Sequence, residues 1–139
     1  MAAIVTPTPA AVMAEVERIM SAHWSWGTAD CCTGACDVYA ALHGIDPMAP
    51  VRGQYEGAMG AYRLIRSWGG FPAMAEALAR IAGLQPGQGQ PGEIGLSAAG
   101  AADGPENRAL LICIQPGAWA GKTPDGFAIL PLADRCWCA

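Results

Sequence analysis

Apolar residues recur at helical spacing near the start of the chain. They fall three or four positions apart at Val12, Val16, Ile19 and Met20. Thr8 is a residue type that caps helices, and Pro9 suits the first helical position. The pattern therefore predicts a helix that begins at Pro9 and ends before Trp24, after a short tail at residues 1–7.

Three further helices are predicted in the same part of the chain. They run from Cys31 to about His43, from Gly57 to Trp68, and from Ala73 to Ala82. Asp30 can cap the first of them, because a short acidic side chain accepts hydrogen bonds from the free N–H groups of a helix start. Gly44 and Gly83 stand where glycine commonly ends a helix. Residues 8–84 are therefore predicted to form a helical half.

The composition changes at residues 85–92, where Gly, Pro and Gln predict a linker without regular structure. Short strand-like runs follow at residues 93–97, 109–115 and 127–132, and turn signals separate the last two. These runs predict a strand half at residues 93–132, and residues 133–139 are left as a Cys-Trp-Cys tail.

The order of the elements, helices first and strands second, indicates the α+β class. We expect N-terminal helices packed on a small C-terminal antiparallel sheet. The linker is too short and the strand half too small for two independent units, so residues 1–139 are predicted to form a single domain.

The composition limits the classes of partner. Of 139 residues, 14% are charged and 53% are apolar, and the formal net charge is −4. Such a chain lacks the cations that displace counterions from phosphate, so no nucleic acid partner is expected. No apolar run is long enough for a membrane span, and the first residues lack the basic region of a signal peptide. The scarcity of charge suggests instead that other chains cover part of the surface.

Cys31 is the sharpest candidate for chemistry. It is predicted to follow the capping residue Asp30, so its thiol lies at the positive end of the helix dipole. That position lowers the pKa of a cysteine and favours the nucleophilic thiolate. The alternative interpretation is that Cys31 is a small apolar residue at a helix start, with Asp30 only positioning the helix.

Several segments resemble segments of one known family, and they occur in the same order along the chain. Residues 26–31 (WGTADC) are similar to the catalytic-cysteine segment of NlpC-type cell-wall peptidases, and residues 91–96 (PGEIGL) resemble the start of a strand in that family, with Glu93 in place of Asp. Four further features resemble a bacteriophage branch of this family. They are the doubled cysteine at 31–32, GIDP at 44–47, RGQY at 52–55 and RLIRSWGG at 63–70. The resemblance runs from about Trp24 to Leu96, and more weakly to Leu132.

This resemblance implies a papain-like fold and a cysteine hydrolase whose base is a histidine at the start of the next strand. Residues 106–112 occupy that place and contain no histidine. His43 lies about 18 Å from Cys31 along a shared helix, which excludes it as the partner. His23 could approach Cys31 across a flexible loop and is the remaining candidate base. Because nucleophile and base act as a unit, loss of the base removes most of the rate.

The six cysteines raise a second possibility. Cys32 and Cys36 are four residues apart on the predicted helix, and Cys136 and Cys138 flank a tryptophan near the C-terminus. Four thiolates could hold zinc or an iron–sulfur cluster, although neither spacing is the usual Cys-x2-Cys of a zinc site. The alternatives are buried core thiols, Cys113 among them, or a disulfide of the tail. The preferred interpretation involves no cofactor.

Taken together, the residues and the resemblance predict a structural component of a phage tail tip or baseplate. It would be located in the virion after assembly in the bacterial cytoplasm, with other tail proteins and possible peptidoglycan contact as its partners. The scaffold would be peptidase-like, with its chemistry lost or weak. One alternative is a cysteine peptidase or amidase that cleaves peptidoglycan as the phage genome enters the cell. A second alternative is a protein with a thiolate-bound zinc or iron–sulfur site.

Overall fold

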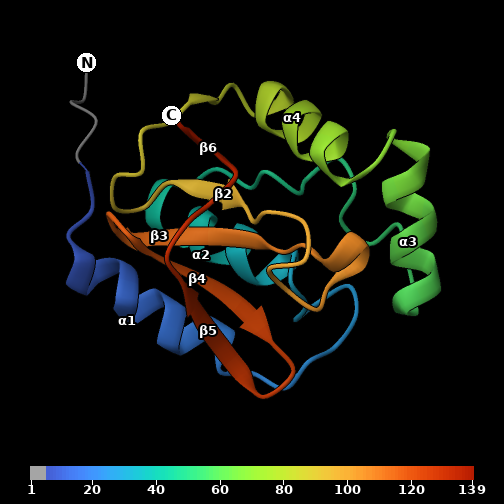
Figure 1. Cartoon of the computed structure of the whole chain (residues 1–139), viewed down its shortest axis with the longest axis horizontal. Coiled ribbons are helices and arrows are strands. Elements are labelled where there is room, and N and C mark those ends of the chain that lie inside the picture. The colour runs from blue at the N-terminus through green and yellow to red at the C-terminus, as the bar shows by residue number, and fades with distance from the viewer. Residues whose placement is uncertain (1–5) are drawn as a thin grey trace.

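A computed structural model describes residues 6–139 and places four helices before a single sheet (Figure 1). The helices are α1 (Pro9–Met20), α2 (Thr33–His43), α3 (Gly57–Ser67) and α4 (Phe71–Ile81). The protein is therefore α+β, with its helices preceding its strands, as predicted. Residues 1–5 of the predicted tail lie outside the described residues.

The six strands form one antiparallel sheet. They are β1 (Gln85–Pro86), β2 (Ile94–Leu96), β3 (Leu110–Gln115), β4 (Ala118–Thr123), β5 (Gly126–Leu130) and β6 (Arg135–Cys138). Their order across the sheet is β1-β6-β2-β3-β4-β5. The last strand of the chain thus lies inside the sheet, between β1 and β2.

Local sequence signals account for the ends of the first two helices. Thr8 accepts a hydrogen bond from the N–H of Ala11 at 3.1 Å and caps α1. Gly44 ends α2 in the left-handed conformation, with φ of 73°. The start of α2 differs from the prediction, because Cys31 and Cys32 form a turn before the first helical residue, Thr33. None of the helices described is both long and apolar enough to cross a membrane.

The helical and strand halves share one hydrophobic core. Helices α1 and α2 pack against each other and against β3 and β4, and Figure 1 shows α2 behind β3. Val16 of α1, Tyr39 of α2 and Phe71 of α4 are fully buried with Ile112 of β3. Complete burial of each large apolar side chain contributes about 1.5–3 kcal/mol. This shared core holds the start of α2 against the middle of the sheet.

Three strand predictions were wrong or incomplete. Only turn signals, Gly121 among them, were predicted between the runs 109–115 and 127–132, but residues 118–123 form β4. Glycine is needed there for packing, since a Cβ at Gly121 would lie 2.8 Å from Cδ2 of Leu111. The predicted tail contains β6, and the predicted linker contributes β1. Both short strands are stabilised by pairing with each other, which no local pattern reports.

Candidate functional site

A buried carboxylate organises the turn before α2. Oδ1 of Asp30 accepts hydrogen bonds from the N–H groups of Cys32 and Thr33, each at 2.9 Å. Oδ2 accepts from the N–H of Gly27 at 2.7 Å and from the hydroxyl of Tyr55 at 2.5 Å. Asp30 is only 1% exposed, so these donors replace its hydration. Asp30 is not the N-cap residue itself, because the N-cap of α2 is Cys32, but its carboxylate accepts the N–H groups of the turn just before α2 and ties that turn to Tyr55.

Tyr55 belongs to the RGQY segment, which therefore supports the turn directly. Burial raises the pKa of Tyr55, and the hydrogen bond to Asp30 raises it further, so the hydroxyl remains a proton donor. Arg52 of the same segment pairs with Asp46 at 2.8 Å and with Asp37 at 2.8 Å. These contacts hold the segment after α2 against the helix itself.

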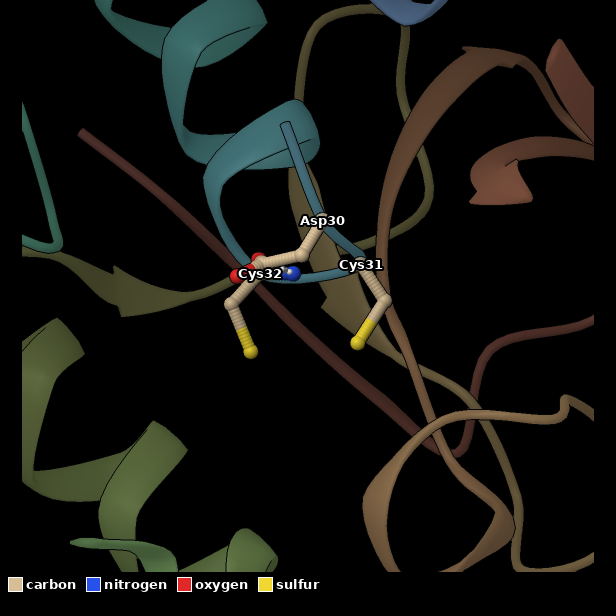
Figure 2. Close-up of side chains that lie close together, drawn as sticks. All are labelled: Asp30, Cys31 and Cys32. Atoms are coloured by element: carbon tan, nitrogen blue, oxygen red, sulfur yellow. Dashed lines mark hydrogen bonds between the residues drawn. The ribbon is translucent and has the colours of Figure 1, made fainter. Parts of the chain in front are cut away.

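Cys31 and Cys32 project their sulfurs from this turn to the same side, as Figure 2 shows. The two sulfurs and a carboxylate oxygen of Asp30 lie within 4.8 Å of one another. Both side chains are buried. A hydrogen bond with Cys31, together with burial, holds the pKa of Cys32 well above its ordinary value. Cys32 is therefore a neutral thiol in this arrangement.

A cavity of about 330 Å³ adjoins Cys31. Trp24 and Trp26 form one wall, with ring centroids 5.0 Å apart in an edge-to-face arrangement. The loop at residues 100–104 forms another wall, and Ala109 lines the cavity beside the sheet. The predicted nucleophile thus faces a largely apolar space of the size that binds small ligands.

The loop over Cys31 approaches its sulfur closely. A Cβ on Gly104 would lie 2.9 Å from Sγ of Cys31 and 2.3 Å from the carbonyl oxygen of Arg108, so only glycine fits there. Glu106 accepts the N–H of Phe71 at 2.8 Å, which fastens the loop to the start of α4. Glu106 adopts φ of 56°, a left-handed conformation that is costly for a residue with a side chain.

Lys122 of β4 lies beside the same cavity, and the sequence did not suggest a role for it. Its ammonium donates to the carbonyl oxygens of Ala22 at 2.6 Å, Thr123 at 2.9 Å and Gly126 at 3.3 Å. Burial lowers the pKa of Lys122. Because three carbonyls take up its three N–H groups, this side chain pins the segment after α1 to the β4–β5 turn and is no free base.

Neither histidine lines the cavity beside Cys31. His43, at the far end of α2, bonds through Nε2 to the carbonyl of Gly92 at 2.8 Å and stacks on Tyr39 with ring centroids 4.3 Å apart. His23 is exposed and is absent from the cavity wall. Over residues 6–139, no imidazole lines the cavity beside Cys31. Residues 106–112, where the resemblance implies the base, contain no histidine, and Ala109 of this segment lines the cavity beside Cys31.

Glu93, the residue that departs from the Pro-Gly-Asp pattern, organises a second loop. Its Oε1 accepts the N–H groups of Gln88 and Gly89, each at 2.9 Å. The thiol of Cys113 donates to the carbonyl of Gly89 at 3.3 Å. Burial is the main cause that raises the pKa of Cys113 to about 12 and that of Cys136 to about 11, and Glu93 adds to both shifts. The segment predicted as a linker is therefore fixed over the sheet.

The predicted zinc or iron–sulfur set does not assemble. Trp137 and Cys36 line one space in the core, and side chains alternate along a strand, so Cys136 and Cys138 project from the opposite face of β6. Cys32 and Cys36 are buried in the helical layer. Among the residues described, Asp30, Cys31 and Cys32 are the only group of three or more metal-ligand types with converging atoms. The six cysteines are all free in the described chain, which excludes the alternative of a tail disulfide in this structure.

Comparison with known proteins assigns this chain to a family. The family DUF6950, a domain of unknown function, matches residues 6–139. Because the match includes both the helical and the strand halves, the chain belongs to this family. No curated protein and no solved structure matches the chain.

Proposed function

We propose that this member of the DUF6950 family is a structural component of a phage tail tip or baseplate, built on an NlpC-like, papain-like scaffold that has lost most or all of its hydrolytic chemistry. The ordered motifs from Trp24 to Leu96 support the scaffold assignment. The α+β order of elements, with Cys31 at the turn before a helix that packs on an antiparallel sheet, is compatible with it.

The residues that line the cavity beside Cys31 are the main support for the proposal that catalysis is lost. A thiol attacks an amide efficiently only when a base within hydrogen-bonding reach takes its proton. Lys122 is the buried basic side chain of the cavity wall, and its N–H groups are committed to three carbonyls. Over the described residues the wall contains no histidine. A nucleophile site without its base supports a binding or assembly role.

The surface supports an assembly role as well. Several large apolar side chains are exposed at separate places in the fold: Met59 of α3, Ile81 of α4, Ile129 of β5 and Leu132 in the loop before β6. Only 14% of the residues are charged. Apolar side chains are enriched at the buried centres of interfaces, where charged residues are depleted. These features fit a protein that neighbouring chains partly cover.

Electron microscopy can test the assembly proposal. We expect an antibody against this chain to label particles from a strain that encodes it, with gold at the tip of the tail. Particles from a strain in which the gene is deleted serve as the control. Intact tails that never contain the chain, by labelling and by mass spectrometry, contradict the proposal.

The second candidate is a cysteine peptidase or amidase acting on peptidoglycan, and it is favoured by the cavity into which Cys31 faces. Sγ of Cys31 would attack the amide carbonyl to form a thioester, the amine would leave with a proton, and water would release the acid. The base would be His23, water or a group from another chain. Digestion of purified peptidoglycan by the wild type but not by Cys31→Ala would establish this candidate and overturn the loss of catalysis.

An added histidine tests the scaffold assignment. Ala109→His introduces an imidazole where the peptidase family has its base, and we expect Cys31 to react faster with iodoacetamide near neutral pH. The matched control is Ala128→His, which places an imidazole on the same cavity wall from β5. Equal rates in the two folded variants would contradict the assignment of Ala109 to the family's base position.

A further inference from the structure

We propose that Cys31 and Cys32 form a binding site for one soft monovalent metal ion of the Cu(I) class. The proposal concerns a site distinct from the zinc or iron–sulfur set that the sequence suggested. It goes beyond the assembly role, because it holds or fails whether or not the protein belongs to a phage tail.

The arrangement of the two sulfurs is the first support. They lie within 4.8 Å of each other and point to the same side of the turn (Figure 2). A closed-shell monovalent ion is satisfied by two sulfur ligands placed on opposite sides of it. Thiolate and thioether ligands select Cu(I) over the harder divalent ions. Two adjacent cysteines therefore provide a complete coordination set for such an ion.

The state of Asp30 is the second support, because it excludes harder ions. Its carboxylate is the third potential ligand of the group, but both oxygens already accept hydrogen bonds, from Cys32 and Thr33 on one side and from Gly27 and Tyr55 on the other. Zn²⁺ needs four ligands, and Mg²⁺ or Ca²⁺ needs more oxygens than this site could free. The two sulfurs remain as the available ligands.

The space beside the sulfurs is the third support. Cys31 and Cys32 line a small cavity of about 10 Å³, and Met48 and Met74 line it too. A space of this size holds one small particle, so an ion must enter without its water shell. Thioether sulfurs are soft and polarizable, which suits them to surround a soft ion. Cys31 also lines the larger cavity, so the two spaces lie on either side of the same residue.

Binding of one ion releases protons and changes the charge of the site. Each thiol that coordinates as a thiolate releases one proton, so full coordination by Cys31 and Cys32 releases two for each ion bound. Because the thiolate and not the thiol is the ligand, protons compete with the ion and apparent affinity increases with pH. The complex carries one net negative charge at the start of α2, where the helix dipole is favourable. The hydrogen-bond donors around Asp30 reduce repulsion from its carboxylate.

A disulfide between the two residues fits the structure less well. Neighbouring Cα atoms across a trans peptide are about 3.8 Å apart, whereas disulfides usually need about 4.4–6.8 Å. The described chain has no cis peptide bond. Oxidation would also require an oxidant, whereas metal binding requires none.

The test is an anaerobic titration of the full, reduced chain with Cu(I) in competition with a coloured Cu(I) chelator. We expect one tightly bound ion per chain and the release of protons on binding. Cys31→Ala and Cys32→Ala should each weaken binding more than about 100-fold, since loss of even an outer-shell partner costs a metal site about 10–100-fold. Cys36→Ala and Cys113→Ala, which remove other buried thiols, should bind as the wild type does.

X-ray absorption on the wild type makes the test independent of how the variants fold. Two sulfur ligands without nitrogen or oxygen support the proposal, and Ag(I) should occupy the same site. Absence of tight Cu(I) binding overturns it, as does equal loss of binding in the two control variants when circular dichroism shows all four folded. Tight binding of Zn²⁺ at Cys31 and Cys32 through four ligands also overturns it.

Discussion

Asp30, in the turn before α2, and Glu93, just before β2, are buried carboxylates that accept backbone N–H groups from glycine-containing loops. Cysteines lie beside both. The loop fixed by Glu93 closes over the sheet, and the thiol of Cys113 is hydrogen-bonded to that loop. The turn fixed by Asp30 instead leaves Cys31 facing a cavity.

The difference between the two regions shows what makes a thiol available to react or to bind a ligand. The thiol of Cys113 donates to two carbonyls, of Gly89 and Gln115, each at 3.3 Å. Such a sulfur is already used in packing and hydrogen bonding. At Cys31 the loop at residues 100–104 approaches the sulfur, but a cavity also adjoins the residue, so its surroundings are not filled by protein on every side. The availability of a thiol therefore depends on what covers its sulfur. The positions of six cysteines in a sequence do not reveal this.

The largest effect is expected from Asp30→Ala. It leaves the N–H groups of Gly27, Cys32 and Thr33 and the hydroxyl of Tyr55 without their acceptor. Each buried donor left unpaired costs about 1–3 kcal/mol, so we expect the free energy of unfolding to fall by more than about 3 kcal/mol. Urea denaturation measures this loss. Asp30→Asn keeps one acceptor oxygen and is the control, expected to lose less.

A pair of glycine substitutions compares the two loops directly. Gly104→Ala places a Cβ 2.3 Å from the carbonyl oxygen of Arg108, a backbone atom, whereas Gly87→Ala places one 2.0 Å from the carboxylate of Glu93, the end of a side chain. Overpacking costs about 1–3 kcal/mol, and rigid backbone yields less than a side chain. We expect Gly104→Ala to be near the top of that range and Gly87→Ala to be near its lower end, by urea denaturation. The reverse order would show that the loop over Cys31 is the more adaptable of the two.

Glu93→Gln should have a smaller effect than these. Glutamine retains an oxygen that can accept from Gln88 and Gly89, so mainly the strength of charged hydrogen bonds is lost, about 1 kcal/mol. Amide hydrogen exchange at Gln88 and Gly89 should become faster, while exchange at Cys32 and Thr33 should not change. Equal acceleration in both loops would show that the two regions open together.

The helical half was predictable because its signals are local. Thr8, Pro9 and Gly44 act on their own helices, and the hydrogen bonds from Cys32 and Thr33 to Asp30 involve only neighbouring residues. The missed features depend on distant partners. The role of Lys122 requires Ala22, which lies 100 positions away in the sequence.

Two parts of the sheet were missed for the same reason. Gly121 is a packing residue under Leu111 rather than a turn signal, and its neighbours form β4. Strand β6 has only four residues, which carry too little pattern to predict a strand. It is ordered by pairing with β1 and β2, and this pairing cannot be read from the local sequence. The candidate nucleophile was found from sequence, but the loop that covers it was not, because Gly104 and Glu106 act through contacts across the fold.

The last expected effect is a pH dependence that belongs to the Glu93 region. The ordinary pKa of a thiol is 9.0, and burial raises that of Cys113 to about 12 and that of Cys136 to about 11 in the folded protein. As pH rises above 9, the unfolded chain loses these protons first. The folded state then binds more protons than the unfolded state, so the stability contribution is full below pH 9 and is lost as pH approaches 11–12.

Urea denaturation between pH 8 and about 10.5 measures this effect, because it spans the ordinary thiol pKa and part of the raised range. Other groups also titrate there, so the informative quantity is the difference between wild type and variant. In the double variant Cys113→Ala, Cys136→Ala the fall in unfolding free energy with pH should be shallower than in the wild type. Cys138→Ala, also on β6, is the single-thiol comparison. An unchanged slope in the double variant would mean that water reaches the Glu93 region, and the contrast with the open cavity at Cys31 would then disappear.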